Sequence, residues 1–329
     1  MGARVEPPLC RATGQPNNGD VLLAEPCAVG VAEDLPLPIR TVLIEQFNAR
    51  PNDQPMCREP LARVSNLQDG AAINALDFPE VRALPGFWFD RPIELLKFKA
   101  DRWALSSGDS LCVASPTSNG SFDVRCAGPD AAVLVLVAVT EIFRASGWLT
   151  VHASGYQSRN RFTTLCLGRS GAGKSVRAVL AAGRGNRFVG EDRVWLRASD
   201  MAVVCCDRRV RLLPRGAAVV PSLPSEGVNT DPDGKLRFPI DLLGLEPAVP
   251  AVLDEWEVLL GELLQDPLKS HGEERKRDRQ LLLSKAAWEA FGVPFLPAAK
   301  AHTARAIHQL MKIPAKVWWR TAEGKFRRV

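Results

Sequence analysis

Apolar residues recur in short runs along the amino-terminal part of the chain, separated by proline, glycine, asparagine and aspartate. These runs include Thr41–Ile44, Leu95–Phe98 and Ser110–Ala114. Short apolar runs between turn residues are typical of β-strands. We therefore predict a mixed, β-rich amino-terminal domain over residues 1–127, with an irregular start over residues 1–35.

The pattern changes near residue 128, where helical and strand-like segments begin to alternate. Asp130–Ala145 has an apolar face and predicts a helix with Asp130 as its cap. Trp148–His152 predicts a strand. Two further apolar segments, Arg193–Arg197 and Met201–Cys206, predict a hairpin.

The carboxyl third alternates proline-rich linkers with periodic apolar segments. Its spacing predicts helices over about residues 254–264, 273–291 and 299–311, followed by a strand at Val317–Trp319. Together with the preceding segments, this alternation predicts one α/β domain over residues 128–329.

Composition and charge narrow the class of protein. The chain has 329 residues, of which 46% are hydrophobic and 24% charged, as in ordinary globular proteins. Its 42 Lys and Arg residues exceed its 37 Asp and Glu residues by only +5, so we expect no nucleic-acid partner. The longest apolar run, Ala131–Val139, is about half of a membrane span, so we expect no membrane partner.

The cysteines indicate the compartment. The eight cysteines lie at positions 10, 27, 57, 112, 126, 166, 205 and 206, without a C-x-x-C pair or paired histidines. This spacing favours neither a zinc site nor a disulfide framework. Since the amino terminus also lacks an apolar secretion signal, we predict a soluble, cytoplasmic protein with reduced thiols.

One segment carries most of the chemical information. Its consecutive residues are Gly168, Arg169, Ser170, Gly171, Ala172, Gly173, Lys174 and Ser175, a full match to the phosphate-binding pattern G-x-x-x-x-G-K-[ST]. The apolar run Phe162–Leu167 before it predicts a strand. After it, Val176, Val179 and Leu180 predict a helix that stops at Gly183. This strand, loop and helix predict a nucleoside triphosphate site.

The chemistry of the loop explains why each of its residues is needed. The glycines let backbone N–H groups turn toward an anionic phosphate, and Lys174 can reach the β and γ oxygens. The hydroxyl of Ser175 is placed to bind Mg²⁺. We therefore predict a nucleoside triphosphate and Mg²⁺ as cofactors.

An acidic pair follows the predicted helix. Glu191 and Asp192 stand side by side at a strand-to-turn position, after Phe188-Val189-Gly190. One carboxylate can bind the metal while the other accepts a proton from an attacking hydroxyl, a division that phosphoryl transfer commonly uses.

Phosphoryl transfer also needs cations on the transferring group. Further along the chain, Arg211, Arg215, Lys235 and Arg237 lie in segments interrupted by proline and glycine. They are candidates to fold over the phosphates, and the alternative is that they are surface cations beside turns.

Three segments in this order resemble a known family. The segments are Val151–Gly155, which contains His152, then residues 168–175, then Gly190–Val194. They resemble the catalytic core of the HPr kinase/phosphorylase family and its relatives, whose nucleotide site is similar to that of phosphoenolpyruvate carboxykinases. Such relatives include kinases that tailor lasso peptide precursors. The resemblance implies a P-loop kinase core that transfers phosphate from ATP with Mg²⁺ to a serine hydroxyl.

The resemblance also implies roles for individual residues. His152 matches a histidine near the phosphates, and Lys174 and Ser175 match the phosphate and metal residues. Glu191 falls where the family has an aspartate assigned as catalytic base, and Asp192 matches a second aspartate close to the metal. The glutamate keeps the charge but lengthens the side chain by one methylene.

Other parts of the chain match the family less. The segment Ile307–Pro314 and the strand Val317–Trp319 resemble the closing helix and strand of such relatives. The family's second signature, an Ile-Arg-Gly-type segment, is missing, which argues against HPr as the acceptor and against phosphorylase activity. Family members often assemble as homo-oligomers, so the resemblance implies that state as well.

Three functions remain open from the sequence. The first is an ATP-dependent kinase that acts on a serine or threonine hydroxyl of a peptide or protein, in peptide natural-product tailoring for instance. The second is a kinase for a small-molecule hydroxyl, such as that of a sugar or amino acid. The third is a nucleotide-gated regulatory protein that has lost its chemistry.

Overall fold

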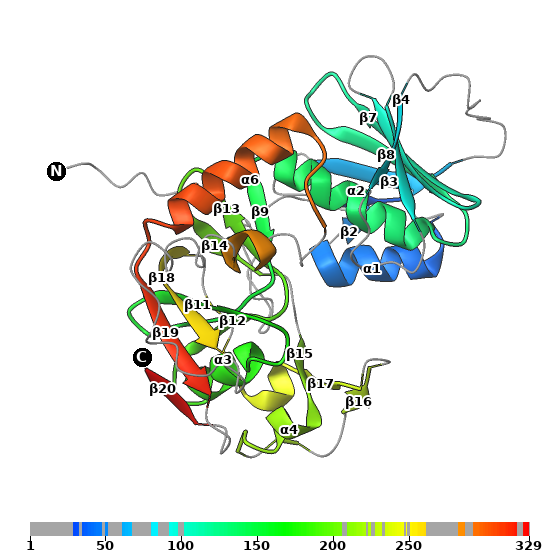
Figure 1. Cartoon of the computed structure of the whole chain (residues 1–329). Coiled ribbons are helices and arrows are strands. Elements are labelled where there is room, and N and C mark those ends of the chain that lie inside the picture. Colours follow the sequence, from blue (N-terminus) through cyan, green and yellow to red (C-terminus); the bar gives the residue numbers. More distant parts are fainter. Residues whose placement is uncertain are drawn as a thin grey trace, which may run out of the picture.

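A computed structural model describes much of the chain in three sheets with covering helices. The described residues are 29–32, 35–47, 50–51, 61–67, 80–84, 92–97, 102–205, 209–221, 223–224, 228–231, 234–246, 248, 251–260, 282–286, 292–320 and 325–328. Within them the fold is mixed α/β, with parallel and antiparallel pairs in the two larger sheets (Figure 1).

The first sheet holds eight strands in the order β2-β1-β3-β8-β7-β6-β5-β4 among the described residues. These strands are β1 (Val29–Val31), β2 (Arg50–Pro51), β3 (Ala62–Asn66), β4 (Glu80–Leu84), β5 (Ile93–Lys97), β6 (Trp103–Ser107), β7 (Ser110–Pro116) and β8 (Phe122–Ala127). Strands β4 to β8 form an antiparallel meander, whereas β1 is parallel to β2 and β3, and β3 to β8.

Much of the predicted β-rich pattern is confirmed in this sheet, with two differences. Thr41–Ile44 belongs to the helix α1 (Leu37–Phe47), because a longer apolar face of that helix, including Ile39 and Leu43, is buried. Val29–Val31, inside the predicted irregular start, forms β1, while residues 1–28 lie outside the described part.

Helix α2 (Ala131–Ala145) covers the first sheet and extends its core. It packs against β6, β7, β8 and α1, and its apolar run is buried there (Figure 1). Asp130 makes no side-chain cap. Its backbone N–H instead donates a hydrogen bond to Oγ of Ser110 on β7, at 2.7 Å. Phe143 of α2 also contacts Trp195 of the second sheet, with ring centroids 5.3 Å apart. The boundary between residues 127 and 128 stays a prediction.

The second sheet holds nine strands among the described residues, in the order β12-β10-β11-β18-β14-β13-β9, with β19 beside β18 and β20 beside β19. These strands are β9 (Trp148–Val151), β10 (Ser154–Gln157), β11 (Thr163–Gly168), β12 (Arg187–Gly190), β13 (Val194–Arg197), β14 (Ala202–Val204), β18 (Ala251–Leu260), β19 (Ala315–Arg320) and β20 (Phe326–Arg328). Strand β18 is parallel to β11 and β19 and antiparallel to β14.

The predicted helix over residues 254–264 is wrong for residues 254–260, which belong to β18. Leucine and glutamate are good helix formers, and their spacing here fits a helical face. In the fold this segment is a central strand whose residues from Glu255 to Leu259 are buried, so tertiary pairing overrides local propensity. Residues 261–264 lie outside the described part.

The other predicted elements of this half agree with the structure where it is described. The strands predicted at Trp148–His152, Phe162–Leu167 and Val317–Trp319 correspond to β9, β11 and β19. The predicted hairpin corresponds to β13 and β14. The helix predicted over 299–311 is α6 (Pro297–Leu310), which packs on α2 and β9. Of the helix predicted over 273–291, residues 282–286 are helical and the rest lies outside the described part.

A third, small sheet lies beside the helix that follows the loop. It contains β15 (Arg209–Leu212), β17 (Leu236–Pro239) and β16 (Asn229–Thr230) in that order, with the short helices α4 (Pro214–Ala217) and η2 (Asp241–Leu243) nearby. Figure 1 places it next to α3 (Lys174–Ala182) in the lower part of the molecule. The sequence did not predict this sheet, because its strands are short and interrupted.

No helix in the described part of the chain is both long and apolar enough to cross a membrane. The most apolar of them, α2, places its apolar side chains in the core instead. The four cysteines within the described ranges, Cys112, Cys126, Cys166 and Cys205, are buried and form no disulfide there.

A buried carboxylate ties α2 to the start of α6. Glu141 Oε1 accepts hydrogen bonds from the backbone N–H groups of Phe295 and Leu296, at 2.5 and 2.6 Å. Its Oε2 lies 3.5 Å from Nη1 of the buried Arg144. Burial raises the pKa of Glu141, but the backbone donors and the arginine keep it partnered.

We expect Glu141→Gln to destabilise the fold by about 2 kcal/mol, because it removes the carboxylate charge that faces the buried Arg144. The exposed Glu94 of β5 offers a matched control, since Glu94→Gln should change stability by less than about 0.5 kcal/mol. Denaturant unfolding of both variants measures the difference. Equal midpoints for the two variants would contradict the assignment of Glu141 as a structural tie.

Candidate functional site

The loop predicted to bind phosphate lies between a buried strand and a helix. All six residues of β11 are buried, and the loop that follows leads directly into α3. Gly171 and Gly173 adopt φ angles of 80° and 96°, a left-handed conformation that glycine adopts without strain. Alternating backbone conformations of this kind turn successive N–H groups toward one point and form an anion-binding concavity.

Two side chains at the start of α3 point back to the loop and across to the acidic pair. Lys174 Nζ donates to the carbonyl oxygens of Gly168 and Arg169, at 3.0 and 3.3 Å. Ser175 Oγ donates to Glu191 Oε1 at 2.8 Å. Arg169 itself is exposed. The structure therefore brings the loop and the acidic pair together.

Glu191 is the buried member of the acidic pair. Its residue is 5% exposed, and its Oε2 accepts a hydrogen bond from the backbone N–H of Arg211. Burial is the main cause that raises the pKa of Glu191 to about 8, and the negative charge of Asp192 adds to it. A carboxyl whose pKa lies close to the operating pH can both accept and release a proton, as an acid–base group must.

Asp192 is the more open member of the pair. It adopts a left-handed φ of 66°, which is uncommon for a residue with a side chain and is often found at functional sites. Its Oδ1 lies 3.2 Å from His152 Nε2, and its Oδ2 pairs with the guanidinium of Arg211. Burial alone would raise its pKa, but the hydrogen bond with His152 and the charge of Arg211 hold it well below the usual range.

The two carboxyls thus have pKa values displaced in opposite directions, an arrangement typical of sites that separate acid–base and electrostatic roles. The structure places Glu191, rather than Asp192, against the Ser175 hydroxyl, whereas the resemblance assigns Asp192 and Ser175 to the metal. Which carboxyl is the base and which the metal ligand stays a prediction.

An open pocket with about 570 Å³ of empty space joins these groups. It is lined by His152, Ser154, Ser170, Gly171, Gly173, Lys174, Ser175, Val176, Glu191, Asp192, Arg211, Leu212, Leu213, Arg215, Gly216 and Lys235. Three of the four cations that the sequence singled out are therefore at the pocket. The fourth, Arg237, is not among its lining residues and pairs with Asp231.

Sequence reasoning missed several residues of this pocket. Ser154, within the Val151–Gly155 segment, is buried on β10. Leu212 and Gly216 belong to β15 and α4, and Leu213 lies between those two elements. Gly216 allows close packing, because a Cβ there would lie 2.9 Å from Val176 Cγ2. Only Ser154, two residues from His152, had a signal in the sequence. The others reach the pocket through the third sheet, which has no motif.

The donor atoms suit a hard cation. Within the described ranges no cluster of three or more His, Cys, Asp or Glu side chains forms a metal cage. Ser175 Oγ and the two carboxylates are nevertheless oxygen donors, which Mg²⁺ prefers. Because Mg²⁺ is usually held by one or two carboxylates together with phosphate oxygens and water, this set fits it without a full protein cage.

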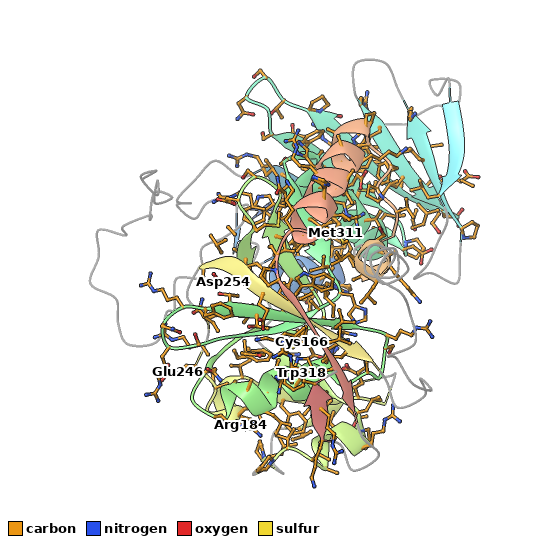
Figure 2. All side chains as sticks on the ribbon, turned by 60° about the vertical axis from the view of Figure 1, so that its left-hand side comes forward. Cys166, Arg184, Glu246, Asp254, Met311 and Trp318 are labelled. Carbon is orange, nitrogen blue, oxygen red and sulfur yellow. The ribbon has the colours of Figure 1, made fainter. Side chains whose placement is uncertain are left out.

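A buried charged network supports α3 from behind the loop. Arg177 of α3 donates from Nε and Nη2 to the two carboxylate oxygens of Glu257 on β18, both at 2.9 Å. Tyr156 donates its hydroxyl to the same carboxylate at 3.0 Å. The guanidinium of Arg177 lies 4.4 Å from the ring centroid of Trp318. Figure 2 labels Trp318 close to Cys166 of β11, and the two belong to one hydrophobic cluster.

The chain is similar to known proteins in structure but matches none of the known families in sequence. No protein-family model and no curated protein matches the chain. Among solved structures, it is similar to the HPr(Ser) kinase/phosphatase from Coxiella burnetii, with 19% sequence identity and a TM-score of 0.25. This similarity covers 36% of this chain and 72% of that chain.

Proposed function

We propose that this protein is an ATP- and Mg²⁺-dependent kinase that transfers the γ-phosphoryl group to a serine or threonine hydroxyl of a peptide or protein. The observation that carries the proposal is the composition of one pocket. It combines the loop residues Lys174 and Ser175, the acidic pair, and the cations Arg211, Arg215 and Lys235. Phosphoryl transfer needs these three groups together.

The residues would divide the work as follows. Lys174 and the pocket cations hold the phosphate oxygens and balance the charge that spreads over them during transfer. The acceptor oxygen forms a bond to the γ-phosphorus while the bond to the β,γ-bridging oxygen breaks, and ADP leaves. The hydroxyl proton passes to the carboxylate of Glu191. Ser175 and Asp192 would hold Mg²⁺, which supplies further charge neutralisation when bound.

His152 would act through its neighbour. Its contact with Asp192 orients the carboxylate and keeps it ionised, so that the pocket retains a fixed negative charge opposite the metal. The resemblance of the three segments to the HPr kinase/phosphorylase family supports a serine-type acceptor. It gives no support for HPr itself, because the second signature is missing.

A second function, nucleotide-gated regulation, is favoured by one observation. Both oxygens of Glu191 already accept hydrogen bonds, from Ser175 and from the backbone of Arg211. A carboxylate held in this way would be a structural link between the loop and the third sheet and would transmit nucleotide binding to that sheet. Tight ATP binding without transfer to any acceptor would support this function.

The test is a transfer assay with γ-labelled ATP and Mg²⁺ and a panel of serine- and threonine-containing peptides. Free serine and simple sugars represent the small-molecule alternative. We expect label in peptides and none in matched peptides whose serine and threonine residues are replaced by alanine. Label only in the small molecules would replace the peptide acceptor by a small hydroxyl compound. Label in no acceptor, despite ATP binding, would contradict the kinase.

A further inference from the structure

Two arginines lie opposite each other on neighbouring strands of the third sheet. Arg211 of β15 and Arg237 of β17 are paired in the antiparallel register. Like charges directly opposite each other on a sheet repel and destabilise the pair. Only Arg211 lines the pocket and contacts Asp192. A negative charge is therefore needed between the two guanidinium groups, so that they can lie opposite each other while Arg211 stays at the pocket.

Asp231, directly after β16, meets both arginines. Its side chain is 3% exposed, its Oδ1 pairs with Arg237 Nε, and its Oδ2 lies 3.7 Å from Arg211 Nη1. Asp231 is not among the residues that line the pocket. A buried carboxylate between two opposed guanidinium groups cancels their repulsion and gives Arg211 a second anchor opposite Asp192.

The backbone of Asp231 also places a second cation. Its N–H donates to the carbonyl oxygen of Lys235 at 2.7 Å, and its carbonyl accepts from the N–H of Gly234 at 2.9 Å. These bonds join Asp231 to Gly234 and Lys235, and Lys235 lines the pocket. Asp231 thus contacts one pocket cation, Arg211, through its side chain and a second, Lys235, through its backbone.

We propose that Asp231 is a positioning residue for phosphate binding, whose side chain holds Arg211 at the wall of the pocket. This inference rests on the proposed function, since the pocket is taken as the site of the nucleotide phosphates. It gives Asp231 a role opposite to the one that its charge alone would have. A carboxylate near an anion site weakens anion binding by repulsion, whereas Asp231 strengthens it by orienting the cations.

Asp231→Asn distinguishes repulsion of the anion from orientation of the cations, because the two effects change phosphate affinity in opposite directions. If charge alone mattered, the loss of a negative charge would tighten the binding of inorganic tripolyphosphate and of Mg²⁺-ATP. We expect both to bind about tenfold more weakly, because Arg211 is pushed away from Arg237 and loses an anchor. Isothermal titration calorimetry of the full chain measures both affinities. The exposed Asp241, in η2, supplies a control, since Asp241→Asn should leave both affinities within about twofold.

A second variant tests the repulsion itself. In Asp231→Asn combined with Arg237→Gln, no opposed cation remains, so we expect the affinities to recover to within about threefold of wild type. Arg237→Gln alone should bind as wild type does. If Asp231→Asn fails to fold, as seen by circular dichroism, Asp231→Ser offers a smaller polar replacement with the same expected loss.

The outcomes separate this inference from the proposed function. Equal or tighter tripolyphosphate binding by a folded Asp231 variant overturns the inference and leaves the kinase proposal intact. A double variant that binds no better than Asp231→Asn overturns the part played by repulsion. Wild-type protein that binds neither tripolyphosphate nor Mg²⁺-ATP overturns the proposed function, and the inference with it.

Discussion

Lys174→Met should reduce phosphate transfer by at least about a hundredfold, because under the proposed function it removes the charge that the loop presents to the β and γ phosphates. Methionine keeps most of the length and apolar stem of the lysine, so helix α3 and the loop should keep their conformation. The lysine is nearly buried, at 6% exposure, and its amine donates to the carbonyl oxygens of Gly168 and Arg169 in the loop. The transfer assay with γ-labelled ATP measures the loss.

The control for this variant is a lysine away from the pocket. Lys300 is exposed on α6, so Lys300→Met should leave both transfer and stability unchanged. Circular dichroism and thermal melting of both variants establish that the fold is retained. Transfer at the wild-type rate by Lys174→Met would remove the loop from the reaction and would leave the proposed kinase without its central residue.

Glu257→Gln should be the most destabilising of the substitutions considered, at about 3 kcal/mol, because it breaks a buried ion pair and leaves the Arg177 guanidinium uncompensated. Glu257 is 1% exposed and receives two hydrogen bonds from Arg177 and one from Tyr156. Burial by itself lowers the pKa of Arg177, but the paired hydrogen bonds with Glu257 raise it above its usual value. The charge of the pair is therefore part of the native fold.

The same strand offers a matched control. Glu255, two residues before Glu257 on β18, pairs with the half-exposed Lys316 at 2.7 Å. Glu255→Gln should cost only about 1 kcal/mol, because Lys316 can turn to solvent. Denaturant unfolding measures both values. Since Arg177 follows Ser175 by half a turn of α3, Glu257→Gln should also weaken binding of Mg²⁺-ATP, and equal stability of the two variants would contradict the role of the pair.

Local features of the candidate site could be predicted from the sequence alone. The strand, the glycine loop and the helix depend on neighbouring residues, namely an apolar run, left-handed glycines and a helical apolar face. The acidic pair could also be predicted, because Glu191 and Asp192 are neighbours in the sequence and directly follow the apolar residues of β12. Of the helices predicted in the carboxyl third, α6 is confirmed, since its pattern is long and periodic.

Long-range pairing could not be predicted in this way. Residues 254–260 have helix-forming composition but lie as a strand between β11 and β19, because both neighbours supply buried partners for them. The charges of Glu255 and Glu257 on this strand are matched by Lys316 and Arg177, which come from β19 and α3. No pattern in one segment reports such a partner.

By itself, the sequence determined the glycine-rich loop between strand and helix, the acidic pair and the β-rich character of much of the described amino-terminal region, because these depend on residues close together along the chain. Only the tertiary structure decided that Arg211, Arg215 and Lys235 reach the pocket while Arg237 turns to Asp231. It also decided that Glu191 contacts Ser175 and that Asp192 contacts His152. These choices follow from strand pairing and from the burial of charge, which only the folded chain brings about.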